Sequence, residues 1–176
     1  VLPHAPVMPV TLNAGMEMPA WFDIENLDFE SFEDETGIKK ATFWIKDLID
    51  EEIKQGVPSD KIILVGFSQG GTLALYTALH YPKRLGGCAG LSTFMPKMAE
   101  KLGDDSLKAN RHLDIFLAHG EQDDLVPHRL GQACYDVLAT HEWPVEFHSY
   151  PMAHQVCMEE MQALGQWIMR CTKVGA

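Results

Sequence analysis

Apolar residues along the chain follow two different spacings, which alternate and predict helices and strands in turn. Helical spacing is found in four segments, at residues 34–55, 69–80, 128–141 and 158–172. Short apolar runs that predict strands occur at residues 61–67, 86–92, 114–118 and 145–150. Strands that alternate with helices indicate βαβ units with right-handed crossovers. The pattern therefore predicts an α/β fold with a mostly parallel sheet and helices on both faces.

Three segments allow more detailed expectations. The run 61–67 is apolar without interruption, which is typical of a parallel strand buried on both faces, and helix 69–80 is apolar nearly all round and should be packed on both sides. In the last helix we expect a buried stripe made of Met161, Leu164, Ile168 and Cys171.

Residues 1–33 contain four prolines and a cluster of acidic residues, and we expect an irregular segment there, either a functional loop or a piece of a larger unit. Val1-Leu2 before Pro3 has the character of a strand end.

Length and composition fit one globular domain over residues 1–176, since 46% of the 176 residues are hydrophobic. The net charge of 14 − 25 = −11 disfavours nucleic acid as a partner, because binding to phosphates needs clustered Lys and Arg. No apolar run approaches the roughly 20 residues of a transmembrane segment. The four cysteines are widely spaced and include no CxxC, which favours reduced thiols and a cytoplasmic location over a metal site or disulfides.

The segment Gly66-Phe67-Ser68-Gln69-Gly70 matches G-x-S-x-G, the pattern of a nucleophile on a sharp turn between a strand and a helix. It follows an apolar strand and opens a helix, which is the context that the chemistry requires. Ser68 is then the candidate nucleophile, Gln69 N–H a candidate oxyanion donor, and the two glycines leave room at the turn. The alternative is an ordinary turn in which Ser68 caps the helix.

A serine nucleophile needs a base and an orienting carboxylate, expected here in the chain order Ser, acid, His. His154 follows the strand 145–150, whereas His119 is a competitor that ends the strand 114–118 and is better explained by a structural role. The acidic loop after His119 offers Asp123 and Asp124, which the pattern cannot separate, and the less favoured Glu121. A solvated acidic loop that caps helix 128–141 is the alternative for this loop.

These motifs together resemble the phospholipase/carboxylesterase group of α/β-hydrolases, which includes acyl-protein thioesterases and small bacterial carboxylesterases. The matching stretches span nearly the whole chain, at residues 3–13, 18–24, 66–71, 119–127 and 150–154. The resemblance implies an α/β-hydrolase fold, assigns the triad acid to Asp123, and places Trp21 and Leu125 near the acyl-binding cleft, although ordinary core packing would explain both equally well.

The group also carries a His-Gly-x-Gly type segment that supplies a second oxyanion N–H, and no such segment precedes Val1 in this sequence. We therefore expect that these 176 residues form the larger part of a domain whose first strands are absent from them.

The hypothesis from the sequence is a serine carboxylesterase acting on small-molecule or lipid esters, with acyl thioesters and lysophospholipids as further candidate substrates. Ser68, His154 and Asp123 would act as nucleophile, base and orienting acid, without metal or organic cofactor. The alternative from another class is a non-catalytic protein that binds acyl ligands or partners on a hydrolase scaffold. A peptidase is disfavoured only by the resemblance, and a homodimer is compatible with the sequence.

Overall fold

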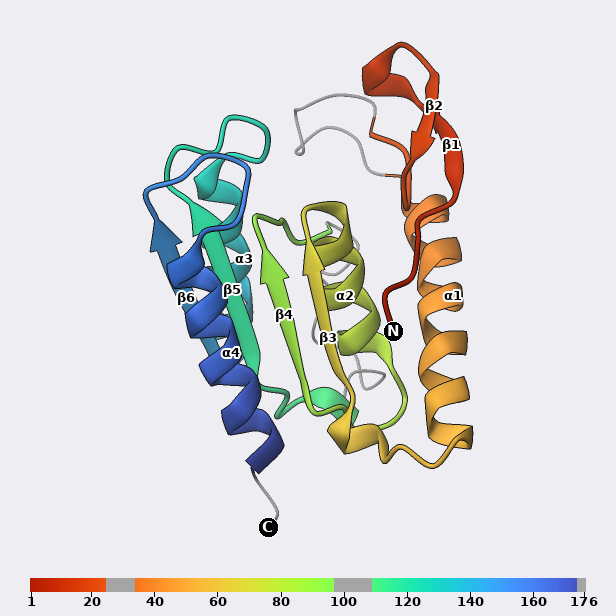
Figure 1. Cartoon of the computed structure of the whole chain (residues 1–176), viewed down its shortest axis with the longest axis vertical. Coiled ribbons are helices and arrows are strands. Elements are labelled where there is room, and N and C mark those ends of the chain that lie inside the picture. Colours follow the sequence, from red (N-terminus) through yellow and green to blue (C-terminus); the bar gives the residue numbers. More distant parts are fainter. Residues whose placement is uncertain (25–33, 97–108, 174–176) are drawn as a thin grey trace.

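The computed structural model describes residues 1–24, 34–96 and 109–173, and its centre is a four-stranded parallel sheet (Figure 1). The strands lie in the order β3-β4-β5-β6, which is also their order along the chain. Their bounds are Ile63–Phe67, Gly87–Leu91, Ile115–Gly120 and Val145–Tyr150. The helices are α1 (Glu35–Lys54), α2 (Gln69–His80), α3 (His128–Thr140) and α4 (Met158–Lys173). The predicted parallel sheet is thus confirmed, and its strands all end at the same edge.

Helices cover both faces of this sheet, as the alternation of apolar side chains along β4 and β5 requires. On one face Cys88 and Leu117 pack against α2 and α3, while α1 packs on the outside of α2. On the other face Ala89 and Phe116 pack against α4, through Leu164 and Trp167. Figure 1 shows α4 in front of the sheet and α3 behind it.

Helix α2 is the central helix that the sequence predicted. It lies between the sheet and α1, and every residue from Gly71 to Leu79 is buried. A helix buried on all sides needs an apolar sequence all round, which explains the weak amphipathicity of this segment.

The amino-terminal segment is more regular than we expected. Strands β1 (Val7–Val10) and β2 (Met16–Pro19) pair in antiparallel fashion, with a 3-10 turn at Thr11–Asn13 between them. Prolines disguise this hairpin in the sequence, although proline is tolerated on edge strands such as these. Val1 and Leu2, predicted to end a strand, lie outside any strand and are exposed. The acidic cluster of this segment falls largely on residues 25–33, outside the described residues.

Two burial predictions are wrong. Strand β3 is not buried on both faces, since Val65 and Phe67 are 47% and 37% exposed. The reason is that α4 packs over β4 and β5 and leaves this face of β3 open. In α4 itself Met161, which we assigned to the buried stripe, is exposed, whereas Glu160 and Trp167, which we left out of it, are buried.

No helix in the described ranges is long and apolar enough to cross a membrane. The four cysteines are unpaired, and burial raises the pKa of Cys134 to about 12, so this thiol stays protonated at neutral pH.

Candidate active site

The turn between β3 and α2 holds Ser68 in a strained conformation at the carboxyl edge of the sheet. Its backbone has φ 54° and ψ −124°, a region that residues other than glycine rarely adopt and that is typical of functional sites. The Ser68 N–H donates to the carbonyl of Leu91 on β4, at 2.9 Å, which anchors the turn to the sheet. The Ser68 side chain makes no capping hydrogen bond to α2, so the alternative in which this serine caps the helix is wrong.

Glycines permit this tight turn, but only one of the two that we named is essential to it. A Cβ on Gly66 would lie 2.0 Å from the carbonyl oxygen of Gly70, which is backbone and cannot move aside. A Cβ on Gly70 would have only Trp21 Nε1 nearby, at 4.0 Å. The second crowded position is Gly71, where a Cβ would lie 2.7 Å from Cβ of Thr93. The close approach of strand and helix therefore depends on Gly66 and Gly71.

Three side chains from three different loops form a continuous hydrogen-bonded chain at this edge. Ser68 Oγ lies 3.0 Å from His154 Nε2, and His154 Nδ1 lies 2.7 Å from Asp123 Oδ2. The carboxylate can only accept, so Nδ1 carries the proton and Nε2 is left to accept from the serine hydroxyl. The Asp123 side chain has no exposure and that of His154 is 13% exposed. A buried carboxylate beside the ring stabilises the imidazolium that forms when Nε2 takes a proton.

The structure separates the two adjacent aspartates that the pattern left open. Asp123 is buried, and its Oδ1 accepts hydrogen bonds from the N–H groups of Leu125 and Val126, at 3.0 and 2.8 Å. Asp124 is exposed, as is Glu121. The acidic loop is thus wrapped around the Asp123 carboxylate, which points inward to His154.

His119, the competing histidine, contacts the same carboxylate from the other side. Its Nε2 donates to the carbonyl of Val126 at 2.8 Å and lies 3.4 Å from Asp123 Oδ2. Burial lowers the pKa of His119, which keeps the ring neutral at pH 7. This histidine therefore holds the acidic loop in place and does not reach Ser68 through its Nε2.

A cleft of about 480 Å³ opens beside Ser68, between the turn and the β1–β2 hairpin. The Gln69 side chain fixes one wall, because its Oε1 accepts from Trp21 N–H and its Nε2 donates to the carbonyl of Phe22. Trp21 lines this cleft, and a role in acyl binding stays a prediction for it. Leu125 is 50% exposed and is not among the residues that line this cleft, and its place near the acyl group stays a prediction.

Sequence reasoning missed two residues that support the turn. Phe67 packs its ring beside the imidazole of His154, with centroids 4.7 Å apart. Thr93 donates from its hydroxyl to the Ser68 carbonyl at 2.9 Å and lies 2.9 Å from the hydroxyl of Thr72. The only signal for Phe67 was its place before the serine, and nothing in the sequence pattern pointed to Thr93.

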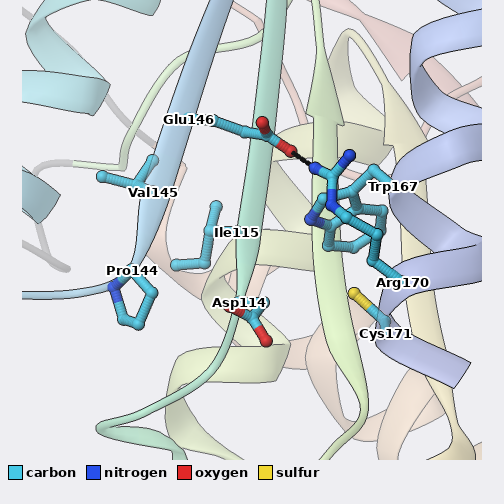
Figure 2. A pocket seen from close by; sticks show the side chains of 8 residues that line it. All are labelled: Asp114, Ile115, Pro144, Val145, Glu146, Trp167, Arg170 and Cys171. Carbon is cyan, nitrogen blue, oxygen red and sulfur yellow. Dashed lines mark hydrogen bonds and ion pairs between the residues drawn. The ribbon is translucent and has the colours of Figure 1, made fainter. Parts of the chain in front are cut away.

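A second pocket, of about 460 Å³, lies at the amino ends of β5 and β6 and holds none of the predicted site residues (Figure 2). Arg170 of α4 pairs there with Glu146 of β6 at 2.5 Å, and Trp167 lines the same pocket. Within the described ranges no group of three or more His, Cys, Asp or Glu residues is arranged to hold a metal ion.

Comparison with known proteins found relatives that match nearly the whole chain. The profile of the phospholipase/carboxylesterase family matches residues 1–172. Acyl-protein thioesterase 1 of Mycosarcoma maydis is 42% identical over 182 residues, which cover 96% of this chain and 75% of that protein. The Neurospora crassa protein of the same name is 38% identical, with 96% of this chain and 71% of the relative covered.

Solved structures with a similar fold include Arabidopsis thaliana SOBER1, at a TM-score of 0.90 and 32% identity, with 98% of this chain and 83% of the other covered. Zea mays acyl-protein thioesterase 2 aligns at a TM-score of 0.85 and 28% identity, covering 97% and 80%. A family profile over nearly the whole chain, together with relatives of this identity, leaves no doubt about membership: the chain belongs to the phospholipase/carboxylesterase family and is a serine esterase with the α/β-hydrolase fold.

Proposed function

We propose that this protein hydrolyses carboxylic esters through an acyl-enzyme formed on Ser68. The observation that carries the proposal is the hydrogen-bonded chain Ser68–His154–Asp123, which faces a cleft at the carboxyl edge of the sheet. A serine hydroxyl is a weak nucleophile by itself, and an adjacent neutral imidazole in the correct tautomer is what activates it.

In the proposed reaction Ser68 Oγ attacks the acyl carbonyl while His154 Nε2 takes the hydroxyl proton. Asp123 stabilises the resulting imidazolium, and the N–H of Gln69, at the N-terminus of α2, donates to the oxyanion. The tetrahedral intermediate then collapses, and His154 returns the proton to the leaving alcohol or thiol. Water, deprotonated by His154, attacks the acyl-enzyme and releases the carboxylic acid and free Ser68.

The cleft supports a substrate with an apolar acyl group. Its walls come mainly from the hairpin, the segment that follows it and the turn at Ser68, and its apolar lining residues are Ala5, Val10, Leu12, Met18, Pro19, Ala20, Trp21, Ile24 and Phe67. An apolar surface next to the nucleophile binds a hydrocarbon chain by excluding water from both. Acyl thioesters are the first candidates, because the relatives named above are acyl-protein thioesterases, and lysophospholipids are the second.

Two measurements test the proposal. Ser68→Ala should abolish turnover of a short p-nitrophenyl ester, and unchanged turnover would remove Ser68 from its assigned role. A fluorophosphonate probe should label the wild-type protein at Ser68. A protein that binds acyl ligands without being labelled would instead be the non-catalytic acyl-binding protein. Comparison of matched oxygen esters and thioesters of one acyl chain then gives the preferred leaving group.

A further inference from the structure

His119 is a buried histidine beside the proposed triad, and the proposed reaction gives it no role. Its side chain is 1% exposed, and the side chain of Asp123 next to it has no exposure. His119 Nε2 lies 3.4 Å from Asp123 Oδ2. The same oxygen lies 2.7 Å from Nδ1 of His154, the proposed base. Two imidazole rings therefore meet at one carboxylate oxygen, and that oxygen is buried from solvent.

A chain of hydrogen bonds connects the His119 ring to the other oxygen of this carboxylate. His119 Nε2 donates to the carbonyl of Val126 at 2.8 Å, and the N–H of Val126 donates to Asp123 Oδ1 at 2.8 Å. The N–H of Leu125 is a second donor to Oδ1, at 3.0 Å. Since a carbonyl oxygen can only accept, the proton of the His119 ring is on Nε2. Both backbone polar groups of Val126 are thus held, one by the ring and the other by the carboxylate.

Helix α3 packs directly against the His119 ring through a residue that has no side chain. A Cβ on Gly131 would lie 2.3 Å from His119 Nδ1 and 3.0 Å from Cγ of the same ring. His128, the first residue of α3, packs its ring edge-on against that of His119, with centroids 5.7 Å apart. The ring therefore has little freedom to turn. Because His119 belongs to β5, its hydrogen bond to Val126 fixes the acidic loop relative to the sheet.

The His119 ring supports the carboxylate without competing for its negative charge. Burial is the largest influence on the pKa of His119 and lowers it, so the ring is neutral at pH 7. A neutral ring contributes a hydrogen bond to the loop and an N–H dipole close to the carboxylate. A second imidazolium would instead share the charge that stabilises the imidazolium of His154 during the reaction. The two histidines at this carboxylate therefore have different roles.

We infer that His119 is a positioning residue for the esterase reaction. Its hydrogen bond to Val126 holds the Asp123 carboxylate in the orientation that the base requires. The inference rests on the proposed function, since it acts through the assigned acid and base. The position needs an N–H donor at the reach of Nε2, and an apolar side chain of similar volume does not suffice. A purely structural residue would affect the stability of the protein but not the rate of its folded form.

Three substitutions separate these two roles. His119→Gln keeps an N–H donor at nearly the reach of Nε2, whereas His119→Leu fills a similar volume without a donor. His141→Leu is the matched control, because Nδ1 of His141 makes the same kind of contact with a backbone carbonyl, that of Val137 at 2.9 Å, just after the end of α3. We expect His119→Leu to lower kcat for a p-nitrophenyl ester at least tenfold, with KM changed less than twofold. His119→Gln should stay within threefold of the wild-type kcat, and His141→Leu should match the wild type.

A double-mutant cycle supplies the readout that a structural role would not produce. If His119 acts through Asp123, then His119→Leu should lower kcat less than threefold further in a protein that already carries Asp123→Asn. A structural residue would lower kcat by the same factor in both backgrounds. Thermal unfolding gives the folded fraction of each variant. An additive cycle, a wild-type kcat in His119→Leu, a loss that only follows the folded fraction, or a His119→Gln variant as slow as His119→Leu would each overturn the inference.

If His119→Leu does not fold, Gly131→Ala replaces it, because a methyl group there would lie 2.3 Å from Nδ1 and must displace the ring without any change in the acidic loop. Its kcat should fall at least fivefold, and a folded Gly131→Ala protein with the wild-type kcat overturns the inference. Failure of the proposed function is distinguishable, since wild-type protein would then neither turn over the ester nor react with a fluorophosphonate probe.

Discussion

Replacing Asp123 by asparagine tests the assigned triad more sharply than removing any of its members. The substitution is isosteric and leaves the loop geometry in place. Oδ1 accepts hydrogen bonds from the N–H groups of Leu125 and Val126, so the asparagine must keep its oxygen at that position. Its NH₂ group then takes the place of Oδ2, which lies 2.7 Å from His154 Nδ1 in the wild-type protein.

Two N–H donors cannot share that contact, so the imidazole changes to the tautomer with the proton on Nε2. That proton points at Ser68 Oγ, 3.0 Å away, and the ring can no longer accept the serine proton. The same change of tautomer in other serine hydrolases lowers kcat by about 10⁴, which corresponds to about 5.5 kcal/mol of transition-state stabilisation. We expect a loss of this order for Asp123→Asn.

The assay is the steady-state hydrolysis of a p-nitrophenyl ester at pH 7.5, together with thermal unfolding to show that the variant is folded. Asp124→Asn is the matched control, because Asp124 is the exposed neighbour on the same loop, and its kcat should stay within twofold of the wild type. A folded Asp123→Asn protein with more than a tenth of the wild-type kcat, or an equal loss in both variants, would refute the tautomer argument.

Three further substitutions follow from the structure. A methyl group at Gly66 would meet the Gly70 carbonyl oxygen at 2.0 Å, so Gly66→Ala should lower the free energy of unfolding in urea by about 1–3 kcal/mol, whereas Gly70→Ala should leave it unchanged. Gln69→Met keeps the backbone N–H but removes the two side-chain hydrogen bonds to Trp21 and Phe22, each contributing about 1 kcal/mol. KM for a long-chain ester should therefore rise about 5- to 30-fold. An unchanged KM would show that these hydrogen bonds are not needed to hold the wall of the cleft. Burial raises the pKa of Glu160 to about 7 from 4.5, so the folded state holds this proton more tightly than the unfolded state does and stability falls as pH rises between these values. Relative to the wild type, Glu160→Gln should therefore gain up to about 3 kcal/mol in free energy of unfolding between pH 5 and pH 8, and parallel curves would contradict the assigned pKa.

The order and type of the central elements could be predicted from the sequence because each follows from local spacing. Helix α2 begins at Gln69 and ends at His80, and strand β6 runs from Val145 to Tyr150, as the pattern predicted. The β1–β2 hairpin was missed because its strands are short and contain Pro9 and Pro19, which weaken the strand signal. Burial of β3 was misjudged because the spacing of apolar residues does not reveal which strands a distant helix covers.

Some residues of the candidate site could likewise be predicted from the sequence, and others could not. Ser68 and His154 could be named in advance, since each follows a strand whose carboxyl end lies at one edge of a parallel sheet. The choice between Asp123 and Asp124 could not be made from the pattern, because it depends on which carboxylate the loop turns inward. Gly71 and Thr93 were missed for a related reason, since their contact is made between elements that are distant in the sequence.

By itself, then, the sequence determined which segments form the central strands and helices, that they alternate into a parallel sheet, and which side chains arrive at its carboxyl edge. These properties depend on periodicity and turn chemistry within about 20 residues of chain. The tertiary structure alone decided the 2.7 Å contact between Asp123 and His154, the open face of β3 and the burial of Glu160. Each of these is a contact between residues far apart in the sequence or a matter of what covers them, and such contacts are set by the packing of whole elements.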